Sequence, residues 1–185
     1  MDSAIWGPQF WRFFDSVAYH GRKAPQATMA FLLTFRSLLP CKYCRESFQE
    51  FSSAVYDQVQ TPSEFVYQVH EKVNQKLGKA NLEFRIYQDR LEALQAPLSS
   101  KDVQNILFSL VTNYSHNESP EQEAAFRKMW RLLPEMLQPM LPKCALAIRQ
   151  CSLPTSRLSG PLLRKTLGCT FQDLQPLELM RRSGK

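Results

Sequence analysis

Hydrophobic residues recur at spacings of three and four along most of this chain, which is the period of a helix that packs through one face. The pattern predicts one helix after Pro8, through residues 10–18, and a second after Pro25, through residues 31–39. A third helix is predicted to begin just after Pro40. Because strand-like alternation is nearly absent, the sequence predicts an all-α fold.

The fourth predicted helix has signals at both ends. Thr61 is suited to cap its first turn, and Glu64 follows three residues later. Gly78 is suited to end the helix, because glycine readily adopts the left-handed conformation found there. A shorter fifth helix is predicted through residues 84–94.

The helical pattern is broken by Ala-Pro-Leu-Ser-Ser at residues 96–100. We therefore expect two helical domains, residues 1–95 and residues 96–185. Beyond Pro154, prolines and short hydrophobic runs leave the secondary structure unassigned. In the second domain three helices are predicted, over residues 103–111, 121–137 and 141–151.

Composition and charge narrow the class of protein. With 185 residues, of which 44% are hydrophobic and 11% aromatic, the chain can form a packed core. It has no run of 18 apolar residues and no apparent secretory signal, so we expect neither a membrane span nor export. The net charge is +6, of which residues 96–185 contribute +5 (12 Lys and Arg against 7 Asp and Glu). No nucleic-acid-binding motif accompanies this charge, so we expect no specific nucleic-acid partner.

The close cysteine pair Cys41 and Cys44 is the strongest chemical signal. Unpaired N–H groups at a helix start stabilise a thiolate, so a pair placed there is suited to thiol–disulfide exchange. A zinc site would need two further ligands, but Cys144, Cys151 and Cys169 lie about a hundred or more residues away without a second close pair. We therefore predict a redox-active dithiol in a helical setting, and no metal.

Three blocks of sequence stand around this pair. They read Trp-Gly-Pro-Gln-Phe-Trp-Arg at residues 6–12, Leu-Pro-Cys-Lys-Tyr-Cys at 39–44 and His-Glu-Lys-Val-Asn-Gln-Lys-Leu-Gly-Lys at 70–79. Together they resemble the Erv/ALR family of FAD-dependent sulfhydryl oxidases. Within that family the sequence is most similar to the compact members encoded by large double-stranded DNA viruses, some of which add a second helical domain.

The resemblance implies a four-helix bundle with a short fifth helix that holds FAD beside the cysteine pair. His70, Val73, Asn74 and Leu77 fall at i, i+3, i+4 and i+7 of the fourth helix, so they share one face that can meet the cofactor. The residues that the resemblance implies as cofactor-binding are Trp6, Trp11, Asp15, His20, His70, Val73, Asn74, Lys76 and Lys79.

Two of these positions depart from the family pattern. Asp15 stands where the family has a histidine, and His20 stands where the family has a tyrosine. A carboxylate at residue 15 would repel the FAD phosphates, so the departure predicts weaker cofactor binding or a local difference in alignment.

The resemblance also implies an activity. Cys41 would be the outer sulfur that exchanges with a substrate dithiol, and Cys44 the inner sulfur that reacts with the flavin. Oxygen would then accept the electrons and give hydrogen peroxide, so that disulfide bonds form de novo in thiol-containing, viral protein substrates. A homodimer is implied, as are the host cytoplasm and the virion, with the mitochondrial intermembrane space as the alternative.

Two questions stay open at this stage. Cys144 or Cys151 can pair with Cys169, pass electrons to Cys41, or be buried and inert. Residues 96–185 can be a pseudo-catalytic bundle or a dimerisation module, and they can replace the dimer contact that the family makes through its first two helices. The rival function is a non-enzymatic helical scaffold whose basic C-terminal half binds a capsid, nucleic-acid or membrane partner.

Overall fold

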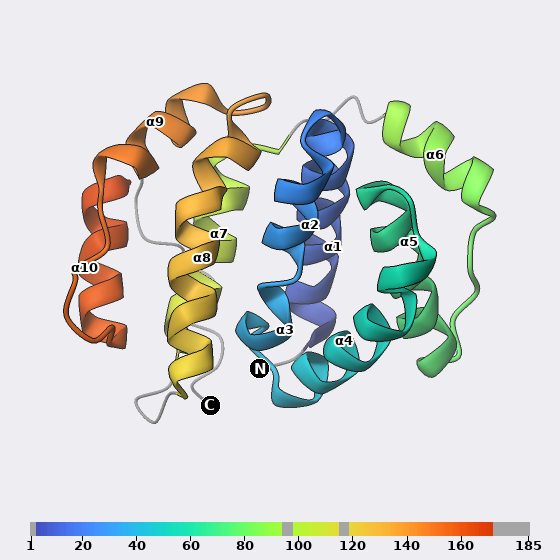
Figure 1. Cartoon of the computed structure of the whole chain (residues 1–185), viewed down its shortest axis with the longest axis horizontal. Helices are drawn as coiled ribbons and strands as arrows, with labels where there is room; N and C mark the ends of the chain where they lie inside the picture. The colour runs from blue at the N-terminus through green and yellow to red at the C-terminus, as the bar shows by residue number, and fades with distance from the viewer. Residues whose placement is uncertain (1–2, 94–97, 115–118, 172–185) are drawn as a thin grey trace.

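The computed structural model describes residues 3–93, 98–114 and 119–171, with side chains from Trp6 onward. Throughout these ranges the regular structure is helical, which confirms the all-α prediction. In chain order the helices are α1 Ser3–His20, α2 Pro25–Leu32, α3 Phe35–Leu38, α4 Lys42–Val55, α5 Pro62–Lys76, α6 Phe84–Glu92, α7 Ser100–Thr112, α8 Pro120–Leu137, α9 Pro142–Gln150 and α10 Gly160–Thr170 (Figure 1). Short 3-10 turns cover Gly21–Lys23 and Tyr56–Gln58.

Two predicted helix limits in the first half were wrong. Helix α1 begins at Ser3 and continues through Pro8. A proline there removes one backbone hydrogen bond, but Trp6 and Phe10 on either side of it are buried in the core. The predicted helix through residues 31–39 is interrupted between α2 and α3, where the Thr34 hydroxyl donates a 2.6 Å hydrogen bond to the Phe31 carbonyl.

The predicted limits of α5 are confirmed. The Thr61 hydroxyl accepts a hydrogen bond from the Glu64 amide at 3.1 Å, and the Glu64 carboxylate accepts one from the Gln60 amide at 2.9 Å. Gly78 follows the helix with a φ of 65°, the left-handed conformation that favours glycine. These contacts fix where α5 starts and ends, and so fix the register of its predicted cofactor face.

Among the described residues of the second half, the structure has the three predicted helices and one more. Helix α7 starts with a full capping box between Ser99 and Asp102, and α8 continues through Pro134. Helix α10 lies in the segment that the sequence left unassigned. Position 94, predicted to end the fifth helix, lies outside the described residues, and the structure ends α6 at Glu92.

One hydrophobic core joins the two halves. Figure 1 shows α4, α5 and α6 on one side of α1, with α7 to α10 on the other. Helix α7 packs against α1, and α8 packs against α2 and α3. The Gln122 side-chain amide donates a 3.1 Å hydrogen bond to the Ser37 carbonyl across this junction. The predicted domain boundary at 95–96 lies within residues 94–97, which are not described. Buried side chains from the helices before and after these residues belong to the same core.

Within the described ranges, no helix combines the length and apolar character needed to cross a bilayer.

Candidate functional site

The cysteine pair lies at the first turn of α4. Cys41 is the N-cap residue, with an extended backbone (φ −97°, ψ 130°), and its Sγ accepts a hydrogen bond from the Cys44 amide at 3.4 Å. The sulfur of Cys41 therefore occupies the place that a capping oxygen usually takes at a helix start. There it meets backbone N–H groups and the positive end of the helix dipole, both of which favour a thiolate.

The two thiols are electrostatically unequal. Burial alone would raise the pKa of Cys41, but hydrogen bonds from the Cys44 thiol and from the Cys44 and Tyr43 amides, together with the Arg45 charge, lower it below its usual value. Burial, followed by the hydrogen bond and charge of Cys41, raises the pKa of Cys44 to about 12. The arrangement makes Cys41 the first thiol to ionise and Cys44 the thiol that holds its proton.

Arg45 supports this pair, a role that the sequence pattern did not predict. Its Nη1 donates a 2.6 Å hydrogen bond to the Leu39 carbonyl, which fixes the turn that leads into Cys41. Its positive charge helps to lower the pKa of Cys41 and opposes the rise in the pKa of Cys44. The available signal was its position four residues after Cys41, since residues at i and i+4 are neighbours on a helix.

The predicted cofactor face of α5 lies close to the dithiol. The charge of Lys76 opposes the rise in the pKa of Cys44, so this charge lies near the inner thiol. Lys76 Nζ also donates a 2.7 Å hydrogen bond to the Ser47 hydroxyl on α4 and lies 5.7 Å from the centre of the Phe51 ring. The structure thus brings together the cysteine pair and the C-terminal turns of α5, although these segments lie far apart in sequence.

The apolar members of this face are incompletely covered. Val73 and Asn74 are half-buried, and the side chain of Leu77, the C-cap residue, is 59% exposed. His70 is half-buried and stacks on the Trp11 indole from α1, with ring centroids 4.0 Å apart and 7° between the planes. Burial, with a smaller effect from the Lys79 charge, lowers the pKa of His70 to about 4, so the imidazole is neutral at physiological pH.

The Asp15 carboxylate is hydrogen-bonded to another residue of the protein. The hydroxyl of Tyr87 on α6 donates a 2.7 Å hydrogen bond to its Oδ1. Burial raises the pKa of Asp15 to about 6, and the Tyr87 hydrogen bond opposes the rise. Sequence reasoning missed this role of Tyr87, because no local pattern links residues 15 and 87.

The other two predicted residues of α1 lie at opposite ends of the helix. Trp6 is buried, and its Nε1 has no hydrogen-bond partner among the described residues. His20 is exposed at the C-terminal end of α1, where it meets the Tyr19 ring edge to face. A helix rises about 1.5 Å per residue, so His20 lies about 13 Å along α1 from Trp11. Since α1 and α5 run in opposite directions (Figure 1), His20 lies toward the start of α5, whereas the dithiol lies near its end.

The chemistry of this side of α5 fits an aromatic cofactor that carries phosphates. The incompletely covered Val73 and Leu77 offer apolar contact, and neutral His70 and the Asn74 amide offer polar contact without a charge. Lys76 and Lys79 are exposed cations on the same stretch of chain. The unpartnered Trp6 Nε1 is a buried donor that an acceptor atom could satisfy.

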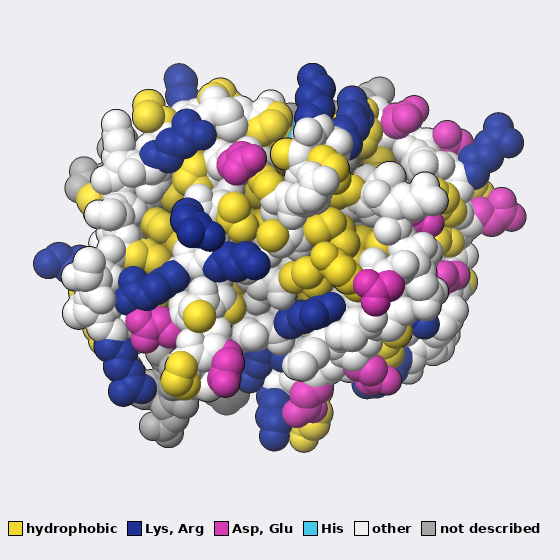
Figure 2. All heavy atoms as spheres, viewed as in Figure 1, with side chains coloured by type: hydrophobic (Ala, Val, Ile, Leu, Met, Phe, Trp, Pro, Cys, Tyr) yellow, Lys and Arg dark blue, Asp and Glu magenta, His cyan; other side chains and the backbone are white. Residues whose placement is uncertain are grey.

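A cavity among the described residues lies elsewhere. It measures about 390 Å³ and is open to solvent. Figure 2 shows Lys and Arg side chains on the α8 side of the molecule, interspersed with hydrophobic ones. No group of three or more metal-ligating side chains occurs in the described parts of the chain. The cavity lining comes from α8, α9 and the following loop, and includes Arg127, Trp130, Arg131, Ile148, Arg149 and Cys151.

The fold and the site define a helical protein with a close pair of free cysteines at a helix start, beside a partly open helix face. Residues 8–92, a little under half of the chain, match the model of the Erv1 / Alr family. Proteins of that family are known for FAD-linked sulfhydryl oxidase activity. The match covers most of α1 and all of α2 to α6, but none of α7 to α10. No curated protein and no solved structure matches the chain.

Proposed function

We propose that this protein is a FAD-dependent sulfhydryl oxidase that makes disulfide bonds in protein substrates. The observation that carries the proposal is the inequality of the two thiols, with a lowered pKa at Cys41 and a raised pKa at Cys44, beside the Lys76 charge at the end of α5. The family match over residues 8–92 supports the same activity.

Cys41 is the thiol that exchanges with substrate. When Cys41 and Cys44 are joined as a disulfide, a substrate thiolate attacks Cys41 Sγ, and the sulfur of Cys44 leaves. The second substrate thiol then attacks its partner sulfur in the mixed disulfide, which releases Cys41 and completes the substrate disulfide. The helix start and Arg45 stabilise the Cys41 thiolate as it leaves.

The proposed cofactor residues bind and orient FAD on the α5 side of the dithiol. His70, Val73 and Asn74 contact the ring systems, and Lys76 and Lys79 offer positive charge to the pyrophosphate. Trp11 positions His70 by stacking on it. When bound, FAD supplies two-electron oxidation of the dithiol and passes the electrons to oxygen, which gives hydrogen peroxide.

The resemblance of the sequence to compact viral oxidases favours a viral protein. Its substrates would be thiol-containing viral proteins in the host cytoplasm or virion. A virus that assembles in a reducing cytosol needs its own source of disulfides. A homodimer remains part of the proposal, but α8 already packs on α2 and α3, so a partner subunit would use another face.

The decisive experiment is the visible absorption spectrum of the purified full chain after incubation with FAD and gel filtration. We expect a retained flavin band that bleaches when a dithiol is added without oxygen and returns with air, together with hydrogen peroxide. Cys44→Ser should abolish thiol consumption, whereas Cys169→Ser, which removes an exposed thiol outside the matched residues, should keep it. A protein that takes up no FAD and consumes no thiol contradicts the proposal.

The second candidate is a scaffold without enzymatic activity. Arg127, Arg131 and Arg149 line the open cavity on the basic side of the molecule, which favours an anionic partner. For a scaffold, binding of such a partner would survive Cys41→Ala and would weaken with salt. An oxidase would instead lose thiol consumption with that substitution.

A further inference from the structure

A second pair of thiols lies outside the candidate site. Cys151 follows α9 as its C-cap residue, and Cys169 lies in the last turn of α10. Their Sγ atoms are 3.0 Å apart. Because a disulfide needs a sulfur separation of about 2.05 Å, a movement of about 1 Å would bring these sulfurs to bonding distance.

The surroundings of Cys151 hold that residue in place. It is buried, and its carbonyl accepts a 3.0 Å hydrogen bond from the Trp130 Nε1 of α8. The third cysteine of this half, Cys144, is also buried, and burial raises its pKa to about 11. Of Cys144 and Cys151, it is Cys151 whose sulfur contacts the sulfur of Cys169.

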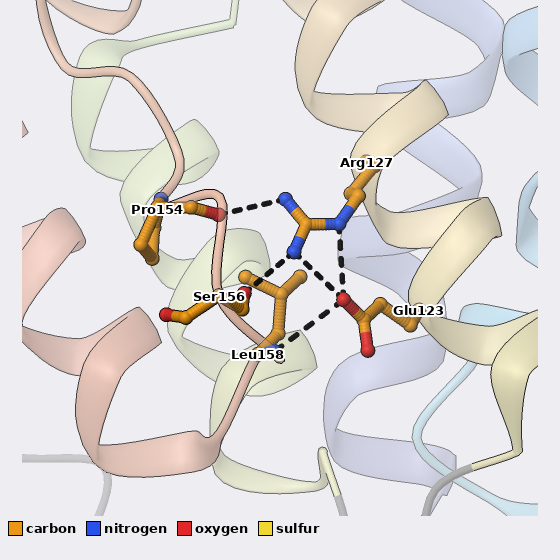
Figure 3. A network of polar contacts seen from close by, with 5 residues as sticks. All are labelled: Glu123, Arg127, Pro154, Ser156 and Leu158. Atoms are coloured by element: carbon orange, nitrogen blue, oxygen red, sulfur yellow. Dashed lines mark hydrogen bonds and ion pairs between the residues drawn. The ribbon is translucent and has the colours of Figure 1, made fainter.

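The loop between Cys151 and the start of α10 is also anchored. As Figure 3 shows, the Arg127 guanidinium donates hydrogen bonds to the Pro154 carbonyl at 2.8 Å and to the Ser156 carbonyl at 2.7 Å. Glu123 accepts from Arg127 and from the Leu158 amide, so both polar partners on α8 hold this loop. These contacts hold the loop in the conformation that brings the two thiols together.

Helix α10 is anchored by its apolar side. Leu163 and Leu167 are fully buried, and α10 packs against both α7 and α9. Cys169 itself is exposed, so a reagent in solution can reach one sulfur of the pair while the other is shielded. This asymmetry suits a two-step exchange, in which the exposed thiol reacts first and the buried thiol resolves the intermediate.

We propose that Cys151 and Cys169 form an intramolecular disulfide that fastens α10 to the end of α9. The bond is made by exchange with an external disulfide, RSSR. The Cys169 thiolate attacks RSSR, which forms a mixed disulfide and releases one RSH after protonation. The Cys151 thiolate then attacks Cys169 Sγ and releases the second RSH. Two protein thiols are oxidised and one external disulfide is reduced, so electrons and protons balance.

The protonation of the pair sets how the reaction depends on pH. The hydrogen bond between the two thiols, followed by the charge of Cys151, raises the pKa of Cys169. Since only the thiolate attacks, we expect the rate of disulfide formation to rise with pH above neutrality.

The chain is well suited to a direct test, because trypsin places each of its five cysteines in a separate peptide. The full-length Cys41→Ser/Cys44→Ser variant is equilibrated with buffers of oxidised and reduced glutathione, quenched with acid, alkylated and digested. We expect a disulfide-linked pair of peptides covering residues 150–157 and 166–181. The peptide of residues 144–149, which carries Cys144, should be recovered alkylated and serves as the internal control.

The bond should also stabilise the fold. Closing this loop in the Cys41→Ser/Cys44→Ser background should raise Tm by roughly 5 °C or more under oxidising conditions. Adding Cys169→Ser should remove that rise, and because Cys169 is exposed this substitution is compatible with folding.

The proposal would be overturned by recovery of both peptides in alkylated form under oxidising glutathione, by glutathione attached to Cys169 without a link to Cys151, or by a disulfide between two chains. The variant lacks the Cys41–Cys44 dithiol, so its outcome is independent of the proposed oxidase activity.

Discussion

The imidazole of His70 lies flat on the indole of Trp11, with centroids 4.0 Å apart and planes within 7° of parallel. The contact joins α1 to α5 at the first residue of the predicted cofactor face. It also helps to bury the imidazole, and burial lowers the pKa of His70 to about 4. Because the pKa of His70 is lowered in the folded protein, this residue makes folding stability depend on pH.

The sign of that dependence follows from where protons bind. Between about pH 6.5 and 4 the unfolded chain protonates His70 and the folded chain does not, so this residue lowers stability as pH falls. Asp15 acts in the opposite direction, because its pKa is raised from 3.8 to about 6 and the folded state binds the proton more tightly. The two residues should largely cancel between pH 4 and 6.

Single substitutions should separate the two effects. Asp15→Asn keeps an acceptor for Tyr87 and removes the buried charge, so it should be more stable than the wild type by about 2 kcal/mol at pH 7 and equal to it near pH 4. His70→Phe keeps a ring on Trp11. It should be more stable than the wild type only near pH 4, by about 2 kcal/mol after allowance for partial exposure. Urea unfolding at each pH measures both differences. Differences that do not change with pH would refute these assignments.

Arg45 should control the reactivity of Cys41. We expect Arg45→Gln to raise the pKa of Cys41 and to slow its alkylation by iodoacetamide at pH 7 by roughly threefold to tenfold, because the thiolate loses a nearby positive charge. The rate is measured on the reduced protein across a pH series.

Two further variants define what Arg45 does. Lys42→Gln removes a charge from the same turn, but Lys42 is exposed and lies 3.9 Å from Glu46, so it should leave the rate nearly unchanged. Arg45→Lys should retain much of the fast reaction, because it keeps the charge. Equal slowing by Lys42→Gln and Arg45→Gln would show that only the total charge matters.

Two glycines should respond in opposite ways to substitution by alanine. A Cβ on Gly21 would collide with the Thr28 hydroxyl and would lie 2.8 Å from Thr28 Cγ2. The Thr28 hydroxyl is fixed there by 2.9 Å hydrogen bonds to the Gly21 and Ala24 carbonyls. We therefore expect Gly21→Ala to lower the free energy of unfolding by about 1–3 kcal/mol.

Gly168 is the matched control, because it is exposed inside α10, is not followed by proline, and a Cβ there would meet no atom of another element within 4 Å. Gly168→Ala should raise stability by about 0.5–1 kcal/mol through its higher helix propensity. Chemical denaturation of the two variants side by side measures both changes. A neutral Gly21→Ala variant would mean that Thr28 can move aside without cost.

The Arg127 network should stabilise the loop after α9. Arg127→Met leaves the Pro154 and Ser156 carbonyls without their donor and should lower Tm by roughly 3–6 °C. Arg131→Met removes an exposed arginine from the same helix and should change Tm much less. Differential scanning calorimetry compares the two. Equal effects would argue against a specific role for the loop contacts.

Local sequence signals predicted those parts of the fold that local interactions determine. Thr61, Glu64 and Gly78 gave the limits of α5, because caps and a left-handed glycine act within one turn. The break between α2 and α3 was invisible, since the hydrophobic spacing continues across it. Helix α10 was missed because its glycine and proline start and its few large apolar residues look like a loop, and its burial depends on α7 and α9.

The candidate site divides in the same way. Cys41, Cys44 and the face that carries His70 were found from spacing and from family resemblance. The contact between Asp15 and Tyr87 joins residues from α1 and α6, so no local pattern could reveal it. Cys151 and Cys169 were one of several pairings open from the sequence, and only the folded loop brings these two sulfurs together.

The packing of α8 on α2 and α3 has a consequence for synthesis of the chain. During translation the apolar sides of these early helices leave the ribosome about a hundred residues before α8 can cover them. At roughly 5–20 residues per second, that surface is uncovered for roughly 5–20 s on each new chain. The nascent protein is therefore most prone to aggregation, and most in need of a chaperone, during synthesis of its second half.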